Sequence, residues 1–227
     1  MKTFFLTSCA LTSLLIAFAT YASPTSSLVH ADTPNPDAIL AQYPNWVLGL
    51  LCESNAYANA NPTPGKTIRF QTPVEINLNG VPQVREAMQN IQAMTSGAVT
   101  FKIVDSIPKV GIIVVAGDAL TRDGLPGLGH VTGSRNPQSA FGLNVQGDGF
   151  IDSQLYIHLG SAQRDYIQEG FHPYSLAEHE LAHALGLAEH FPGFTGIEGI
   201  TMEPLVTLTA LYRIPPGTDV SRFCKSE

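Results

Sequence analysis

The 227-residue sequence is 44% hydrophobic and 14% charged, a composition that suits one globular domain flanked by terminal processing segments. Acidic residues outnumber basic residues by 19 to 12, and no cluster of lysine or arginine is present. Because binding to a phosphate backbone requires such a cluster, the composition argues against nucleic acid as a partner.

The first 31 residues are predicted to be an export signal that is removed. Lys2 supplies a positive charge, and residues 4–19 form an apolar stretch interrupted only by Thr, Ser and Cys. Small-residue patterns allow cleavage at several points up to Asp32, the start that we favour. The stretch is shorter than the about 20 apolar residues of a membrane-spanning helix. We therefore expect a secreted protein without stable membrane association, with lipid attachment at Cys9 as an alternative.

Residues 32–65 are predicted to be a short prosegment or an N-terminal arm, because they are rich in Pro, Asn, Ser and Ala. After export, Cys52 and Cys224 would be the two remaining cysteines, and an even pair in an exported protein predicts one disulfide. Closing so long a loop is worth about 4 to 5 kcal/mol in the chain-entropy model. The alternative is that Cys52 is an inhibitory thiolate that occupies a metal in a latent precursor.

Residues 66–227 are predicted to form one domain with an α/β order of elements. The spacing of apolar residues predicts strands at 68–70 and 74–78, a helix at 81–93, strands at 99–104, 110–116 and 155–159, and a glycine-rich loop at 117–149. No internal repeat suggests a solenoid.

The segment from Ser175 to Gly186 is predicted to contain a helix, at about residues 176–185, that carries a metal site. Ser175 and Glu178 form a capping-box pattern, and Gly186 is a typical helix terminator. His179 and His183 lie one helical turn apart, so both imidazoles leave the same face and can bind one ion. Two histidines at this spacing also occur as a polar patch on a surface helix, so the pair alone does not establish a metal site.

Glu180 is the candidate general base beside these histidines. In a His-Glu-x-x-His arrangement, zinc acidifies a water, and the glutamate takes a proton from that water and later passes it to the leaving amine. After Gly186 the chain can turn back, so that Glu189 or His190 supplies a third ligand. Three protein ligands leave one position of a catalytic zinc open.

Residues 179–190, with the sequence HELAHALGLAEH, and residues 200–204, with the sequence ITMEP, together resemble the metzincin zinc peptidases, in particular matrixin-like enzymes. The resemblance implies that His190 is the third zinc ligand, although the commonest family spacing would select Glu189. It also implies that Met202 and Pro204 form a Met-turn, with Met202 as a hydrophobic floor beneath the zinc.

The resemblance further implies a twisted, mostly parallel sheet with one antiparallel edge strand, a backing helix and the active-site helix. Residues 154–159 resemble the edge strand on which metzincins bind an extended substrate. Structural calcium is a further option through the acidic side chains of the glycine-rich segment, which are Asp118, Asp123, Asp148 and Asp152. The remaining histidines are expected to be surface residues or hydrogen-bonded polar groups, namely His130, His158 and His172.

We therefore expect a monomeric, secreted endopeptidase with one catalytic zinc per chain and a protein or peptide substrate. One alternative is a two-histidine metalloprotease whose third ligand is a distant glutamate, but Glu198 and Glu203 lie too close to the expected Met-turn to favour it. The other is an exported zinc-binding or adhesion module with a vestigial protease site. The presence of Glu180 argues against the second alternative, because a module that only binds zinc has no need of a base beside it.

Overall fold

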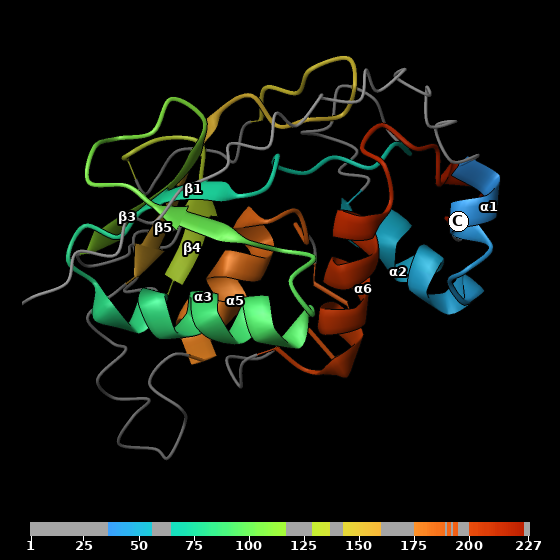
Figure 1. Cartoon of the computed structure of the whole chain (residues 1–227), viewed down its shortest axis with the longest axis horizontal. Coiled ribbons are helices and arrows are strands. Elements are labelled where there is room, and N and C mark those ends of the chain that lie inside the picture. Colours follow the sequence, from blue (N-terminus) through green and yellow to red (C-terminus); the bar gives the residue numbers. More distant parts are fainter. Residues whose placement is uncertain are drawn as a thin grey trace, which may run out of the picture. The chain divides into compact units, whose positions relative to one another are not determined.

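The structure is a computed structural model that describes residues 36–55, 65–116, 129–136, 143–159, 175–188, 190–191, 193–194 and 200–224. Its elements in chain order are α1 (Pro36–Leu40), α2 (Asn45–Asn55), β1 (Val74–Asn77), α3 (Pro82–Met94), β2 (Phe101–Ile103), β3 (Gly111–Ala116), β4 (Gly129–Thr132), β5 (Gln154–Leu159), α5 (Ser175–Ala184), α6 (Met202–Arg213) and the 3-10 helix η1 (Ser221–Phe223) (Figure 1). The predicted export signal lies outside the described residues. Among the residues described, no helix is long and apolar enough to span a membrane.

The five strands form one sheet in the order β2-β1-β3-β5-β4. The pairs among β2, β1, β3 and β5 are parallel, and β4 pairs antiparallel with β5. The centre of the sheet is apolar: Ile112 and Val114 of β3 are fully buried, and so are Leu155 and Ile157 of β5. Strands buried in this way read as continuous apolar runs, which is why the sequence predicts them well. The predicted α/β class and mostly parallel sheet with one antiparallel edge strand are confirmed.

The prediction of which strand forms the antiparallel edge was wrong. Residues 154–159 form β5, which is parallel to β3 and has a neighbour on both sides. The antiparallel edge strand is β4, which lies inside the segment that we expected to be a glycine-rich loop. A short apolar run looks the same in an inner and in an edge strand, and the sequence GHVT of β4 has too few apolar residues to predict a strand.

The prediction of a strand at 68–70 was also wrong, because this segment forms only an isolated bridge. Arg69 pairs with Phe150 in that bridge. The Arg69 N–H donates to the Gly149 carbonyl at 3.2 Å, and the Ile151 N–H donates to the Arg69 carbonyl at 2.9 Å. Ile68 is nevertheless buried, so the apolar alternation here reflects burial without membership in the sheet.

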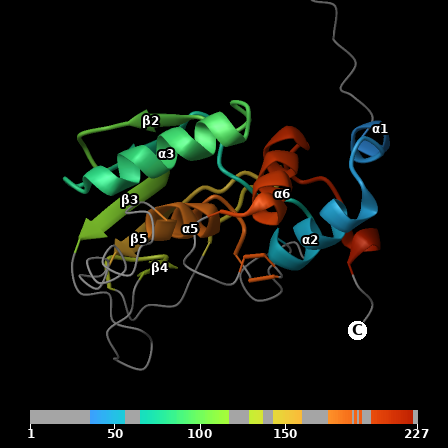
Figure 2. The same cartoon turned by 90° about the horizontal axis from the view of Figure 1, so that it is seen from below.

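Helices α3 and α5 cover the same face of the sheet and pack against each other (Figures 1 and 2). Three residues of α3 at helical spacing, Val84, Ala87 and Ile91, are 0% exposed. This is the apolar stripe that the sequence predicts, and its burial in the main hydrophobic core explains why the helix forms here. The backing helix is therefore confirmed, and it lies next to the helix that carries the histidines.

Residues 36–55, the described part of the segment expected to be a prosegment or arm, are part of the packed domain. Helix α2 packs against α6 and η1, and its residues Val47, Leu48 and Leu51 belong to the main hydrophobic core. Cys52 of α2 forms the predicted disulfide with Cys224, with the two Cα atoms 5.2 Å apart. In this structure Cys52 is therefore not a free thiolate that could occupy a metal.

Candidate metal centre

Helix α5 is the platform of the site, and its position is fixed by the residues on its apolar face. Ala177, Leu181 and Ala184 are 0% exposed, and α5 contacts α3, β4 and β5. The side-chain amide of Asn90 in α3 donates to Glu178 Oε1 at 2.9 Å, which adds a polar contact between the two helices. The histidines and Glu180 are thus carried on a rigid element, as a preorganised site requires.

The chain leaves α5 through a sharp turn at Gly186. This residue has φ of +123°, a conformation that other residues rarely adopt. The N–H groups of Gly186 and Leu187 donate to the carbonyls of His183 and Ala182, each at 3.0 Å, and these bonds close the helix end. The hydroxyl of Tyr212 in α6 donates to the Leu185 carbonyl at 3.1 Å. The turn directs the following residues back toward the histidines of the helix.

Three imidazole nitrogens meet at the end of this turn. The Nε2 atom of His179 is 3.0 Å from that of His183 and 3.1 Å from that of His190, and the last two are 3.2 Å apart. Four ligands arranged tetrahedrally at about 2.0 to 2.1 Å from zinc would be about 3.3 to 3.4 Å from one another. The observed separations are close to this geometry, so the three nitrogens could hold a metal ion.

His183 also has the tautomer that metal binding needs. Its Nδ1 atom is 2.6 Å from the Leu187 carbonyl, which can only accept a hydrogen bond, so Nδ1 carries the proton. Burial, together with the neighbouring His179 and His190, lowers the pKa of His183 to about 3, and burial with His190 lowers the pKa of His179 to about 4. Both rings are therefore neutral near pH 7, and the Nε2 atom of His183 presents a lone pair to the site.

The structure brings His190 to the other two histidines, as the resemblance implied. Its side chain is exposed, whereas that of His179 is buried and that of His183 is partly buried. Glu189, the alternative third ligand, lies outside the described residues, as does Glu198. Within the described part of the chain, no second group of three metal-binding side chains converges.

Glu180 follows His179 in α5 and is buried. Its side chain is 4% exposed, and its Oε2 atom is buried without a hydrogen-bond partner among the described residues. A methyl group added at Gly129 of β4 would lie 2.8 Å from Glu180 Oε1, so the edge strand borders this carboxyl directly. Burial raises the pKa of Glu180 to about 8 in the absence of a cation. A buried carboxyl without a partner is costly, and such groups are typical of functional sites.

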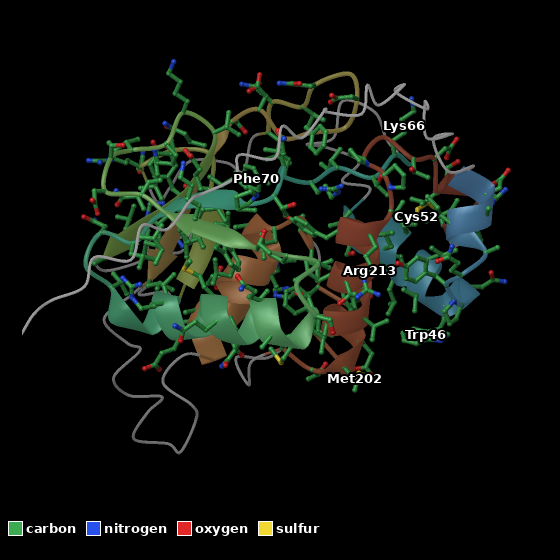
Figure 3. The ribbon with its side chains drawn as sticks, in the orientation of Figure 1. Trp46, Cys52, Lys66, Phe70, Met202 and Arg213 are labelled. Atoms are coloured by element: carbon green, nitrogen blue, oxygen red, sulfur yellow. A yellow bond between two sulfur atoms is a disulfide. The ribbon has the colours of Figure 1, made fainter. Side chains whose placement is uncertain are left out.

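Phe194 forms the apolar floor of the histidine cluster, a role that we had assigned to Met202. The Phe194 ring is 1% exposed, and its centroid lies 4.5, 4.7 and 5.7 Å from those of His179, His183 and His190. Met202 is 66% exposed at the first position of α6, and Figure 3 shows it at the end of that helix. The prediction that Met202 forms this floor is therefore wrong in this structure, because a side chain so exposed to solvent is not buried beneath an ion.

Pro204, the other residue of the expected Met-turn, is buried in the first turn of α6. Proline is well tolerated there, because the first N–H groups of a helix have no partner within it. The segment ITMEP therefore leads directly into a helix, and the turn before it falls largely on residues outside the described set.

Of the other histidines and aspartates considered as ligands, His158 and Asp148 form side-chain hydrogen bonds within the fold. His158 of β5 is buried, and its Nε2 atom is 2.9 Å from the Thr132 hydroxyl. Its ring stacks on that of His130 at a centroid distance of 4.9 Å. Asp148 accepts a hydrogen bond from the Phe150 N–H at 3.1 Å, which closes a turn. Calcium binding therefore stays a prediction, and His172, Asp118 and Asp123 lie outside the described residues.

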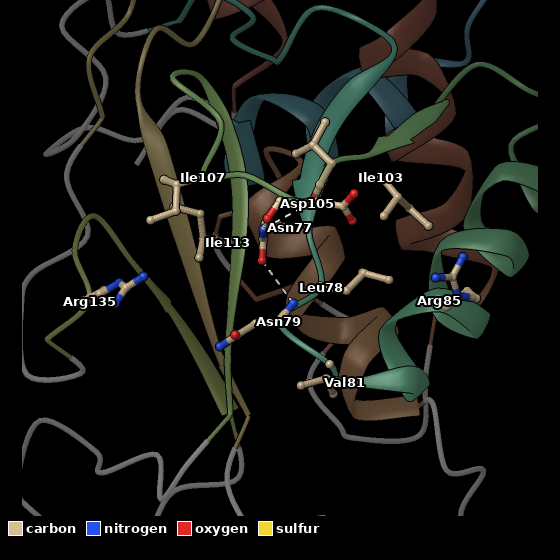
Figure 4. Close-up of a pocket in the computed structure, with 12 residues that line it drawn as sticks. Asn77, Leu78, Asn79, Val81, Arg85, Ile103, Asp105, Ile107, Ile113 and Arg135 are labelled. Carbon is tan, nitrogen blue, oxygen red and sulfur yellow. Dashed lines mark hydrogen bonds between the residues drawn. The ribbon is translucent and has the colours of Figure 1, made fainter.

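A cavity of about 660 Å³ opens at the carboxyl end of β1, away from the histidine cluster, and Figure 4 shows its lining (Figure 4). Arg85 and Arg135 approach it from opposite sides. The side-chain amide of Asn77 is used within the protein, because it donates to the Asp105 carbonyl at 2.9 Å and to the carbonyls on either side of it. None of the three histidines lines this cavity, so it is separate from the candidate metal centre.

No protein-family model matches the sequence, and no curated protein matches it either. The assignment of the metal site therefore depends on the residues and their geometry.

Sequence reasoning did not identify two residues that shape the site, Phe194 and Gly129. Phe194 follows His190 by four residues in a segment that carries no regular spacing, and Gly129 lies in a strand that the sequence did not predict. Their roles depend on contacts between separate segments, so no local pattern in the sequence indicates them.

Proposed function

We propose that this protein is a secreted, zinc-dependent endopeptidase of the metzincin type, similar to matrixins. One observation carries the proposal: three imidazole nitrogens lie within 3.2 Å of one another, on and just beyond the helix in which the buried Glu180 follows His179. His179, His183 and His190 would hold the zinc. This donor set is typical of catalytic zinc sites, in which three protein ligands leave a position open.

The proposed reaction assigns distinct roles to the metal and to Glu180. When bound, zinc supplies Lewis acidity that polarises the scissile carbonyl and makes water a nucleophile at neutral pH. Glu180 accepts a proton from the attacking water and donates it to the leaving amine. A divalent cation nearby favours the charged form of the carboxyl, so metal binding would lower the pKa of Glu180 from its raised value and prepare it to act as a base.

The edge strand β4 supports a substrate that binds in an extended conformation. It is one of the two outermost strands of the described sheet, the other being β2, and an edge strand can pair with the main chain of a peptide. Its first residue, Gly129, borders the Glu180 carboxyl, so a peptide added to β4 would run past the proposed base. We therefore transfer to β4 the substrate-binding role that the sequence had suggested for residues 154–159.

The disulfide supports the proposed extracellular location. Structural disulfides form and persist in oxidising compartments, and the chain joins Cys52 to Cys224. The apolar stretch at residues 4–19 supports an export signal. Secretion would also bring the enzyme to protein substrates outside the cell.

The proposal is tested by cleavage of a peptide library by the purified mature protein. We expect endoproteolytic products that disappear when a chelator removes the metal and reappear when zinc is restored. Glu180→Gln should retain zinc while turnover falls by at least about two orders of magnitude.

Glu178→Gln is the matched control for this experiment. It changes a carboxyl on the same helix but can keep an acceptor for the side-chain amide of Asn90, so turnover should stay near that of the wild type. Activity that survives complete metal removal would contradict the proposal. Zinc binding without any turnover would favour the vestigial binding module.

A further inference from the structure

The segment that carries the third histidine is held by the N-terminal part of the chain. The Ala188 N–H, two residues before His190, donates to the Ser54 carbonyl of α2 at 2.9 Å. On its other side the same segment accepts a hydrogen bond from His183 at the Leu187 carbonyl. Leu187 is fully buried, so the backbone of the exit segment is fixed by α2 and α5 together.

Helix α2 is in turn fixed to the C-terminal part of the fold. Cys52, two residues before Ser54, is joined to Cys224, which follows η1. Both Cys52 and Ser54 are buried, with exposed fractions of 2% and 0%. Helix α2 packs against α6, and Figure 3 shows Cys52 on α2. The carbonyl that receives the Ala188 N–H is therefore part of a cross-linked unit.

This anchoring matters most for His190. His179 and His183 are fixed by the helical backbone of α5, whereas His190 is an exposed residue beyond the helix end. A ligand outside regular structure depends on the contacts that orient its backbone. The hydrogen bond between Ala188 and Ser54 is such a contact, and it lies two residues from the ligand.

We propose that residues 36–55, clamped by the Cys52–Cys224 disulfide, are the positioning element of the third metal ligand. The proposal rests on the metal site proposed above. It assigns a role in the mature protein to a segment that the sequence suggested could be a removable prosegment. Loss of the clamp would allow α2 to shift, and His190 would then lose its fixed place beside His179 and His183. The helical pair would retain a weaker two-histidine site.

A double-mutant cycle on zinc affinity tests this proposal. Zinc binding, measured by competition with a chromogenic chelator, is compared for the wild type, Cys52→Ala/Cys224→Ala, His190→Ala and the triple variant. Loss of the disulfide should weaken zinc binding by about tenfold or more when His190 is present, the size expected for groups that orient a ligand. In the His190→Ala background, loss of the disulfide should weaken zinc binding by less than about twofold. An equal loss in both backgrounds would overturn the proposal, because general destabilisation would weaken both sites alike.

A second variant addresses the hydrogen bond itself without removing the cross-link. Ala188→Pro removes the N–H that donates to Ser54, and Ala188→Gly is the control that retains it. The proline variant should lose zinc affinity by about tenfold or more relative to the glycine variant. Equal affinity in the two variants would overturn the role of this bond.

Amide hydrogen exchange separates this proposal from the proposed function, because it needs no metal. In the metal-free protein, peptides covering residues 187–191 should exchange faster after Cys52→Ala/Cys224→Ala, while peptides from α3 keep their protection. Unchanged exchange at 187–191 would overturn the proposal even if zinc binds. If the wild type binds no zinc but residues 187–191 still exchange faster in the Cys52→Ala/Cys224→Ala variant, the proposed function is contradicted while the positioning of this segment by α2 stays supported.

Discussion

Replacement of Phe194 by alanine should destabilise the protein and its metal centre far more than replacement of Met202. Phe194 is 1% exposed and contacts the rings of His179, His183, His190 and Phe191. Truncation of a buried phenylalanine typically costs about 3 to 5 kcal/mol, because it removes buried apolar area and leaves a cavity. Met202→Ala, at a position 66% exposed, should stay within about 0.5 kcal/mol.

Urea unfolding of the metal-free variants measures this difference, and chelator competition measures the zinc affinity of each. The cavity under the three rings lets them move, so Phe194→Ala should also weaken zinc binding by about tenfold or more, the range found when groups that orient ligands are removed. Met202→Ala should bind zinc as the wild type does. The reasoning is refuted if Met202→Ala is the more damaging change, which would place the methionine beneath the ion as the family resemblance implied.

Three further predictions concern the ligand set and the base. His190→Ala should lower zinc affinity and peptidase activity severely, whereas Glu189→Ala should leave most of both; the reverse result would make Glu189 the third ligand. Gly129→Ala should lower turnover but not zinc content, because its new methyl group would lie 2.8 Å from Glu180 Oε1; unchanged turnover would show that the carboxyl need not stay in place. In the metal-free protein, Glu180→Gln should raise the free energy of unfolding measured in urea relative to the wild type, by an amount that grows from pH 4.5 to 8. A difference that does not change with pH would contradict this prediction.

The sign of the last prediction follows from the raised pKa of Glu180. Burial raises this pKa from 4.5 to about 8, so between these values the folded state holds a proton that the unfolded state has lost. The free energy of unfolding of the wild type therefore falls as pH rises through the window, with a limiting slope of about 1.4 kcal/mol per pH unit. Glutamine does not titrate, so its advantage grows over the same range.

The helix of the metal site could be predicted closely from the sequence. We expected residues 176–185, and α5 spans Ser175–Ala184. The prediction succeeded because several local signals agree there, including the cap pattern, the alanine and leucine residues, and the terminating Gly186. The sequence left Glu189 and His190 as third ligands, and the family resemblance was needed to choose His190, because its approach to the helix depends on the turn at Gly186 and on the contact between Ala188 and Ser54.

The features that sequence reasoning missed are those set by long-range packing. Strand β4 has little apolar content and is stabilised by pairing with β5, so its sequence alone predicts a loop. Helix α2 lies in a segment whose composition suggests an arm, and its burial becomes apparent only when α6 packs against it. In both cases the tertiary partner decides the structure, and the local sequence does not identify that partner.

X-ray absorption at the zinc edge of the purified mature protein tests the central claim most directly, because it reports the ligands of the ion itself. The proposed site predicts one zinc per chain, with three imidazole nitrogens at about 2.0 to 2.1 Å and one further light ligand. In His190→Ala the number of imidazole ligands should fall from three to two. A wild-type protein that holds no zinc, or a zinc whose imidazole ligands are unchanged by His190→Ala, would contradict the account.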